Sequence, residues 1–435
     1  MNQIKDPAKR KWIIVATMFL AIICNYLDRQ LLSILKPEIL NHFVIGDMEY
    51  AWIVNIFLIC YAIMYPLSGI LVDRFGPKRV IFGGLTAWSL ACIGGGLAPN
   101  VWIFAFCRGI LGLAEPTIFA GQLVAVTLWF EKRQRATANS LCTVGGSLGA
   151  VIAPLVIAWL MRLLGNWQHV FLISGTVGLV LAALWLLIYF TPPRHILERT
   201  VGQDVSRSRS TTKFSFKGLF GTRTLWGGIL IRLVSDPVWY FCCFWLPGFL
   251  RGMGASQGLS TQQTLDMIQW IGGIPFLVGA IGGILTSVWS DRMISRGVSA
   301  LKARKKMMVT LAAIAPICML VPFVNSSSVG FGLKVGLVIL IFSLVAVMCL
   351  SWLYTLPVVL AETFPIGNVA TVMGLSCGAG ALGSVVFNLF TGSIPESGWE
   401  WLFILMGTLH IIAAIILTRL VRPETPTTLQ NENDN

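Results

Sequence analysis

The stretch GILVDRFGPKR, residues 69–79, decides the fold of this chain. It joins two long apolar runs, and it holds an Asp–Arg pair, two glycines and further basic residues in a short polar turn. A weaker copy, TSVWSDRMISRG at 286–297, follows another apolar run much later. Each copy comes after the second apolar run of its half of the chain. The chain is therefore predicted to consist of two similar halves, related as a parallel repeat.

The composition predicts a membrane protein. Of the 435 residues, 56% are hydrophobic and 12% are charged, whereas soluble proteins carry about 25% charged residues. The apolar runs are continuous over about 20 residues, which suits membrane helices and not the alternation of a β-barrel. An all-α fold of twelve transmembrane helices in two six-helix repeats is predicted, with spans near 12–35, 51–73, 79–98, 100–129, 135–163, 169–190, 223–250, 265–290, 306–325, 330–360, 367–390 and 398–420.

The placement of basic residues predicts the orientation. With the N-terminus inside, 25 of the 32 Lys and Arg residues fall in inner segments and four in outer ones, which is the positive-inside pattern. A multi-pass protein of the plasma membrane, expected to be a bacterial inner membrane, is predicted with both termini cytoplasmic. The net charge of +13 then reflects topology and contact with the lipid bilayer. It does not indicate a nucleic-acid partner, because the basic residues are spread over many loops.

The long polar stretch at 191–222 divides the chain. Its centre, VSRSRSTTK, is rich in Arg, Ser and Thr and is typical of a flexible linker. The predicted organisation is an N-terminal six-helix bundle at 1–190, a cytoplasmic linker at 191–222, a C-terminal bundle at 223–422 and a cytoplasmic tail at 423–435. A substrate would bind between the two bundles, near the middle of the membrane.

Four ionisable residues inside spans carry the functional prediction: Asp28 and Arg29 in the first span, Arg108 and Glu115 in the fourth. A lone charge at the bilayer centre costs about 2.5–3.5 kcal/mol, so such groups face partners or a wet cavity. Arg108 and Glu115 lie on one helix face, about 10 Å apart along the axis, so each needs a partner on another helix or a ligand. Asp28 and Arg29 point about 100° apart. We expect one to face the cavity and the other its rim or a neighbouring helix.

Arginine and a carboxyl together suit proton-coupled anion transport. A guanidinium matches a carboxylate bidentately, and a buried carboxyl can carry the coupling proton. An ion-pair network that locks helices together is the alternative for Arg29 with Glu115, and for a further pair, Arg232 with Asp236 in the seventh span.

Other polar and aromatic residues in the spans are candidate ligand contacts, although aromatic residues in spans also serve as packing and interface anchors. The candidates are Asn25, Tyr26, Tyr61, Thr143, Tyr240, Trp352, Tyr354 and Asn388. A second set, in the two loop copies, is predicted to control conformational gating: Gly69, Asp73, Arg74, Gly76, Asp291 and Arg292. Gly69 and Gly76 suit a tight helix end and a close helix approach. Gly145, Gly146 and Gly149 form a small-residue face that predicts close helix packing in the fifth span.

The twelve-span layout and the two loop copies resemble the major facilitator superfamily over nearly the whole chain. Within it, the chain looks like the anion:cation symporter family, and most like its hexuronate/aldonate branch. The matching stretches are NYLDRQLLS at 25–33, RGILGLAEPTIFAG at 108–121, WFEKRQRATANS at 129–140 and DPVWYFCCFWLPGFL at 236–250.

The resemblance implies roles for the four charged residues. Arg29 and Arg108 would recognise the substrate carboxylate, and Asp28 and Glu115 would carry the proton. The chain departs from the family pattern at Pro77, where a basic residue is usual, at Ser287 in the second loop copy, where glycine is usual, and at Pro116, which can kink the fourth span and re-aim Glu115.

The leading hypothesis is proton-coupled symport of a sugar-acid anion by alternating access, in a functional monomer. The alternatives are a sodium-coupled or exchange carrier of another organic anion or phosphate, and a non-transporting sensor on the same fold. An enzyme is not expected, because no nucleophile–base pair, phosphate-binding loop or metal-ligand spacing is visible, and the ten cysteines all fall in apolar runs. No cofactor is predicted beyond a coupling ion, H⁺.

Overall fold

The computed structural model describes residues 7–130, 132–192, 216–364, 366–394 and 399–422, and this part of the chain is helical and without strands. It contains eleven helical segments that are long and apolar enough to cross a membrane, and some of them, such as Val101–Trp129, join consecutive helices. The predicted all-α membrane fold is confirmed. The remaining predicted span, 79–98, falls on the second part of helix α3.

The chain forms two compact units, one of residues 1–45 and 53–212, the other of 46–52 and 213–435. The predicted domain limits stay a prediction, because most of the linker, 193–215, and the tail at 423–435 lie outside the described residues.

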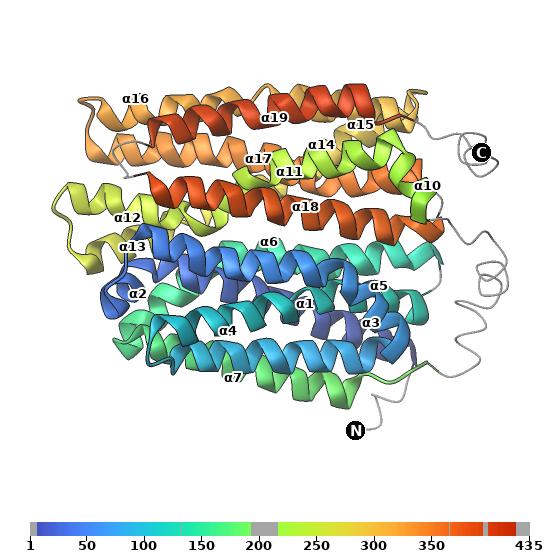
Figure 1. Ribbon diagram of the computed structural model, residues 1–435, viewed down its shortest axis with the longest axis horizontal. Helices are drawn as coiled ribbons and strands as arrows, with labels where there is room; N and C mark the ends of the chain where they lie inside the picture. The colour runs from blue at the N-terminus through green and yellow to red at the C-terminus, as the bar shows by residue number, and fades with distance from the viewer. Residues whose placement is uncertain (1–6, 131, 193–215, 365, 395–398, 423–435) are drawn as a thin grey trace. The chain divides into compact units, whose positions relative to one another are not determined.

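The helices of the first unit follow the predicted spans (Figure 1). They are α1 (Pro7–Ile34), α2 (Lys36–Phe43), α3 (Asp47–Gly96, of which residues 47–52 belong to the second unit), α4 (Val101–Ala114), α5 (Pro116–Trp129), α6 (Lys132–Leu164) and α7 (Trp167–Ile188). Helix α1 packs along α6 and α7 and also contacts α5. The helices beside α1 thus belong to its own unit, so polar side chains on its buried faces must find partners there.

Glycines allow the close contact of α1 with α6. A Cβ on Gly145 would lie 2.7 Å from the Phe19 carbonyl oxygen, and one on Gly149 would lie 2.7 Å from that of Ile23. Gly146 lies against the Tyr26 ring in the same way. The small-residue face predicted in the fifth span is confirmed, since any larger side chain there would push the two backbones apart.

The helical backbone of the first unit is interrupted at Gly76 and at Pro116. Gly76 has φ +77° and ψ 157°, which breaks the helical backbone inside α3. This left-handed φ favours glycine, and the predicted tight helix end is confirmed. At Gly69, by contrast, a Cβ would meet nothing within 4 Å, so the close approach predicted at this glycine is not seen. Pro116 begins α5 directly after Glu115, because proline has no N–H to continue the helix.

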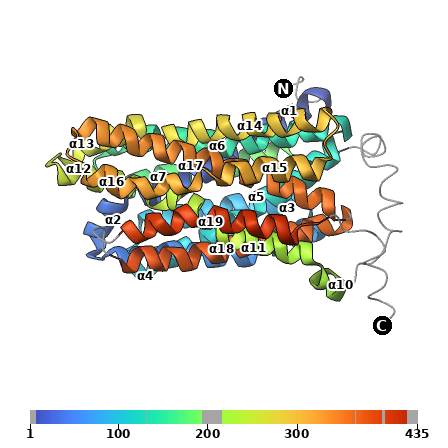
Figure 2. The ribbon, with the colours of Figure 1, turned by 90° about the horizontal axis from the view of Figure 1, so that it is seen from above.

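The second unit contains the remaining helices. They are α10 (Phe216–Gly221), α11 (Arg223–Phe244), α12 (Leu246–Ser256), α13 (Thr261–Ile271), α14 (Ile274–Ser295), α15 (Ala300–Ala312), the 3₁₀ helix η2 (Ala315–Leu320), α16 (Val321–Ser326), α17 (Phe331–Thr363), α18 (Ile366–Ser393) and α19 (Glu400–Leu420). Figures 1 and 2 both show α11 beside α18, and α14 packs along α17. Predicted spans 223–250 and 265–290 are each divided, with a proline at the start of the following helix.

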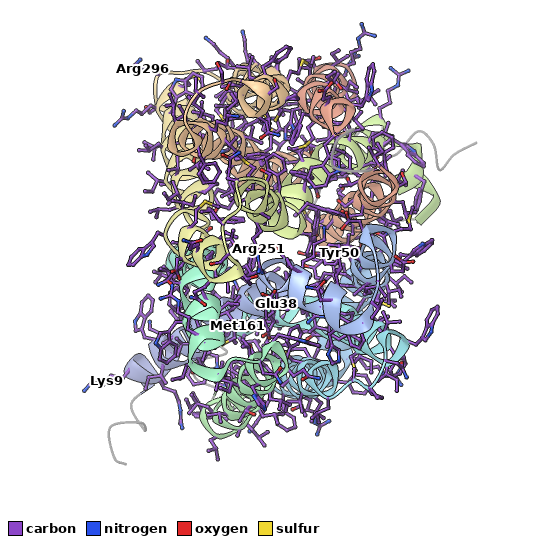
Figure 3. All side chains as sticks on the ribbon, turned by 90° about the vertical axis from the view of Figure 1, so that its left-hand side faces the viewer. Lys9, Glu38, Tyr50, Met161, Arg251 and Arg296 are labelled. Atoms are coloured by element: carbon purple, nitrogen blue, oxygen red, sulfur yellow. The ribbon has the colours of Figure 1, made fainter. Side chains whose placement is uncertain are left out.

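Two basic side chains point away from the helix packing. Figure 3 looks along the helices, and Lys9 and Arg296 each extend outward from the helices of their own unit.

The ten cysteines are free thiols, seven buried and three partly buried. They act as small apolar residues within the helix packing.

Candidate functional site

The centre of the site is a buried ion pair between Arg29 on α1 and Glu115 at the α4–α5 junction. The Arg29 Nε–H donates to Glu115 Oε2 at 2.6 Å, and Nη2 lies 2.6 Å from the same oxygen. Glu115 is fully buried and Arg29 is 8% exposed. Glu115 keeps helical backbone angles just before Pro116, and Pro116 divides the predicted fourth span there. The predicted need of Glu115 for a partner on another helix is confirmed.

Aromatic rings surround the Arg29 guanidinium. Its carbon lies 4.8 Å from the centre of the Tyr61 ring, 5.1 Å from Tyr26 and 5.6 Å from Phe57. The rings provide a cation–π environment and exclude water from the ion pair. The structure thus brings together three predicted residues, Arg29, Tyr26 and Tyr61. Phe57 is a member of this group that the sequence reasoning missed, because one phenylalanine among many apolar residues has no distinguishing pattern.

Asp28 points away from Arg29 and toward α7. The Ser174 hydroxyl donates to Asp28 Oδ1, and the Cys92 thiol lies 3.8 Å from the same oxygen. Asp28 is 1% exposed, and its Oδ2 has no hydrogen-bond partner among the residues that the structure describes. Adjacent residues on a helix point about 100° apart, which is why Asp28 and Arg29 contact different neighbours. Sequence reasoning did not find Ser174 or Cys92.

Arg108 on α4 completes the charged group. It is 3% exposed, and its guanidinium carbon lies 5.0 Å from the centre of the Phe171 ring and 5.5 Å from Phe104. It interacts electrostatically with Asp28. The four charged residues predicted from the sequence therefore form one buried cluster in the first unit, with two positive and two negative groups.

Two further predicted contacts lie on α1 and α6. Asn25 is fully buried, and its amide has no hydrogen-bond partner within the described part of the chain. It precedes Arg29 by four residues and so shares its helix face. Thr143 is exposed, and its hydroxyl donates to the Asn139 carbonyl of its own helix at 2.9 Å. The amide is a candidate donor and acceptor for a polar ligand, whereas the Thr143 hydroxyl is already bonded.

In the second unit, two of the predicted contacts form hydrogen bonds between helices. The Trp352 indole N–H donates to the Met308 carbonyl at 3.1 Å, and its ring lies edge-on to His410. Asn388 is fully buried and accepts from the Trp245 indole N–H at 2.9 Å, and its amide nitrogen has no hydrogen-bond partner within the described residues. Ligand binding by these two residues stays a prediction.

The second predicted pair, Arg232 with Asp236, is present within helix α11. Arg232 Nη1 lies 3.2 Å from Asp236 Oδ2, and both side chains are buried. Gly380 on α18 leaves the room for the carboxyl, since a Cβ there would lie 2.8 Å from Asp236 Cγ. The pair joins neighbouring turns of one helix, so its role in a network that locks helices together stays a prediction.

The predicted gating residues lie at helix ends. Asp291 pairs with Arg304 at 3.7 Å, with its side chain 66% exposed. Arg292 is exposed nearby, and the Arg74 guanidinium carbon lies 5.4 Å from the centre of the Phe75 ring. The side chain of Asp73 lies outside the described residues. Within the described residues, no group of three or more His, Cys, Asp or Glu side chains could hold a metal ion.

The family model described as Major Facilitator Superfamily matches residues 18–358 and 259–435. The chain belongs to the Major Facilitator Superfamily. The hexuronate transporter of Escherichia coli (strain K12) is 26% identical over 439 residues, covering 98% of this chain and 97% of that protein. The galacturonate transporter of Dickeya chrysanthemi is 27% identical over 315 residues, covering 70% and 88%.

A solved structure shows the same fold. The inward-open xylose transporter XylE from E. coli superposes with a TM-score of 0.71 at 15% identity, covering 98% of this chain and 99% of that one. The twelve-helix architecture of the Major Facilitator Superfamily is thereby supported. The family match and the named relatives make the chain a multi-pass membrane transport protein and not an enzyme. The predicted resemblance to this superfamily and to its sugar-acid transporters is confirmed.

Proposed function

We propose that this protein carries a sugar-acid anion across a bacterial inner membrane together with a proton, by alternating access. The observation that carries the proposal is the buried Arg29–Glu115 ion pair. The two relatives named above are transporters of hexuronate and of galacturonate, and these anions carry a carboxylate. A guanidinium is the side chain best matched to that group.

Arg29 can exchange Glu115 for the substrate carboxylate as its partner. When Glu115 is ionised, it neutralises Arg29 and occupies its guanidinium. When Glu115 takes up a proton, the guanidinium becomes available for the substrate carboxylate. The cluster has the same net charge in both states, because the substrate anion replaces the charge that the proton removed. Because the net charge is equal, the free energy of reorienting the site from one side of the membrane to the other is similar with and without bound substrate.

The surroundings suit the rest of a sugar acid. Tyr26 and Tyr61 present aromatic faces next to the guanidinium, and aromatic faces suit the apolar side of a sugar ring. The Asn25 amide can donate to and accept from hydroxyl groups. Arg108 and Asp28 form a second pair of opposite charges in the same cluster, which we assign to further anion recognition and proton binding.

Transport into proteoliposomes tests the proposal. Labelled galacturonate, glucuronate and galactonate are offered with an inward proton gradient, with a sodium gradient and with neither. We expect accumulation of at least one sugar acid under the proton gradient. In Glu115→Gln, proton-driven accumulation should fall at least about tenfold, while exchange of labelled for unlabelled substrate continues, because the amide cannot carry the proton.

Glu400→Gln is the matched control, because this glutamate is exposed at the start of α19 and should transport like the unchanged protein. Accumulation by Glu115→Gln at the unchanged level would exclude the coupling role. Accumulation driven only by sodium would replace the proton with sodium as the coupling ion and leave the carboxylate site in place.

A further inference from the structure

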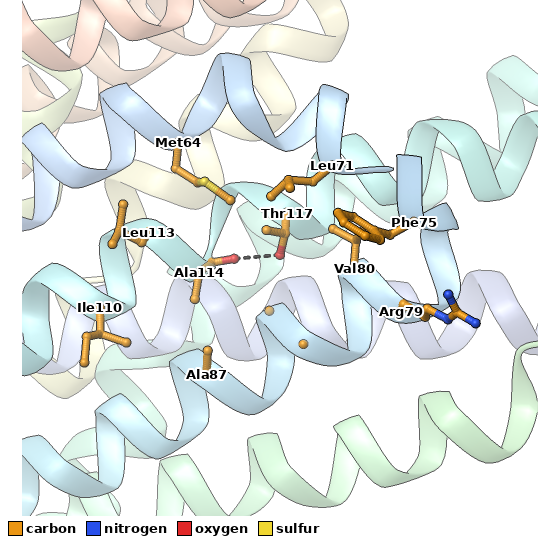
Figure 4. A pocket seen from close by; sticks show the side chains of 12 residues that line it. Met64, Leu71, Phe75, Arg79, Val80, Ala87, Ile110, Leu113, Ala114 and Thr117 are labelled. Atoms are coloured by element: carbon orange, nitrogen blue, oxygen red, sulfur yellow. Dashed lines mark hydrogen bonds between the residues drawn. The ribbon is translucent and has the colours of Figure 1, made fainter. Parts of the chain in front are cut away.

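A pocket of about 370 Å³ lies in the first unit, between the two parts of α3 and the α4–α5 junction. Its volume falls in the range of small-ligand sites. Figure 4 shows Arg79 at one end and Ile110 at the other, with Phe75, Val80 and Leu113 among the side chains between them. The pocket is therefore an elongated apolar space with one charged end.

Hardly any polar groups face this pocket. The Thr117 hydroxyl donates to the Ala114 carbonyl at 2.6 Å (Figure 4), so it is already bonded. Arg79 is exposed, and among the described side chains no carboxylate forms an ion pair with it. Arg74 and Lys78 add further positive charge in the same turn. A ligand here must be apolar along most of its length and anionic at the Arg79 end.

Two large apolar side chains that line the pocket are exposed among the described residues. Phe75 is 46% exposed and Leu113 is 41% exposed. Large exposed apolar side chains within a membrane span indicate contact with lipid. The material available to fill an apolar space at this surface is the acyl chain of a lipid.

We propose that this pocket binds one acyl chain of an anionic phospholipid, with the lipid phosphate held by Arg79. Arginine binds phosphate bidentately, and basic pockets between transmembrane helices on the cytoplasmic side bind anionic headgroups. With the orientation predicted from the basic residues, Arg79 lies on the cytoplasmic side, so the lipid comes from the inner leaflet. The site is separate from the Arg29–Glu115 pair and does not depend on the transported substrate.

Gly83 offers a direct way to fill the pocket. It is part of the lining, and a Cβ on it would meet nothing within 4 Å. A leucine there would occupy the space of the acyl chain without displacing the backbone. Gly336 on α17 of the second unit is also exposed, with nothing within 4 Å of a Cβ. Gly336→Leu is therefore a matched control that makes the same change away from the pocket.

Lipid retention measured by native mass spectrometry tests the proposal on the full-length protein. The protein is reconstituted with an equal mixture of phosphatidylglycerol and phosphatidylcholine and then released into detergent. We expect the unchanged protein and Gly336→Leu to retain phosphatidylglycerol. Gly83→Leu should retain about tenfold less, since it loses the buried methylene groups of one chain. Arg79→Gln should lose the preference for phosphatidylglycerol over phosphatidylcholine.

Two further arms separate the chain from the headgroup. Inorganic phosphate and a short-chain phosphatidylglycerol should compete at least about tenfold more weakly than the long-chain lipid. Equal retention of phosphatidylglycerol by Gly83→Leu and the unchanged protein would overturn the proposal. If Gly83→Leu does not fold, as judged by size-exclusion chromatography, Ala87→Leu replaces it, because Ala87 also lines the pocket. Retention by folded Ala87→Leu at the unchanged level would overturn the proposal equally.

Discussion

Arg29 is the side chain on which the proposed transport cycle depends most directly. In Arg29→Lys the charge remains, but the planar fork that matches a carboxylate is lost. A charge-assisted hydrogen bond is worth about 1.5–3 kcal/mol, so we expect the KM for the sugar acid to rise about 10- to 100-fold. Uptake kinetics in proteoliposomes measure this, with Arg419→Lys, exposed in the last turn of α19, as the control. An unchanged KM would remove Arg29 from substrate recognition.

Ser174 is expected to hold the Asp28 carboxyl in place for transport. Its hydroxyl donates to Asp28 Oδ1, and Asp28 Oδ2 has no hydrogen-bond partner among the described residues. Ser174→Ala removes this bond, and a hydrogen bond to a charged group contributes about 1.5–3 kcal/mol. Proton-driven uptake should therefore fall about tenfold.

Uptake into proteoliposomes under an inward proton gradient tests the role of Ser174. Ser384→Ala is the control, because this serine is also buried but donates to a carbonyl of its own helix, that of Gly380. Uptake by Ser174→Ala at the unchanged level would show that the hydroxyl serves packing alone.

At the scale of the helices, the contact of α1 with α6 determines how firmly the charged cluster is held. Gly149→Val would place methyl groups against the Ile23 carbonyl, where even a Cβ lies at 2.7 Å. Overpacking of this kind costs about 1–3 kcal/mol, so the temperature of unfolding in detergent should fall. Gly336→Val is the control, since nothing lies within 4 Å of a Cβ there. Equal unfolding temperatures for both variants would contradict the close contact.

For the whole molecule, the distribution of basic residues makes a prediction about orientation that fusions can measure. A fluorescent protein joined after Asn435 should fluoresce, because the C-terminus is expected in the cytoplasm. An alkaline phosphatase inserted between Gly165 and Asn166, in the connection from α6 to α7, should be active, because this connection is expected outside. The reverse pattern of signals would show that the protein has the opposite orientation.

Much of this protein follows from its sequence alone. The transmembrane spans were predictable because the transfer of about 20 apolar residues into lipid is a local property of each run. The four buried charged residues were predictable for the same reason. A charge inside such a run costs free energy, so it must face a partner or a water-filled cavity. The break at Pro116 and the glycine turn at Gly76 followed from the backbone chemistry of single residues.

Only the tertiary structure decided which groups meet. Arg29 and Glu115 are 86 residues apart in the sequence, and Asp28 and Ser174 are 146 apart. These pairings depend on which helices pack together and on how each helix is rotated, and in lipid both are determined by side-chain fit between helices and not by hydropathy. The same reason applies to Trp352, whose indole N–H donates to the Met308 carbonyl 44 residues away, a partner that its place in the sequence did not reveal.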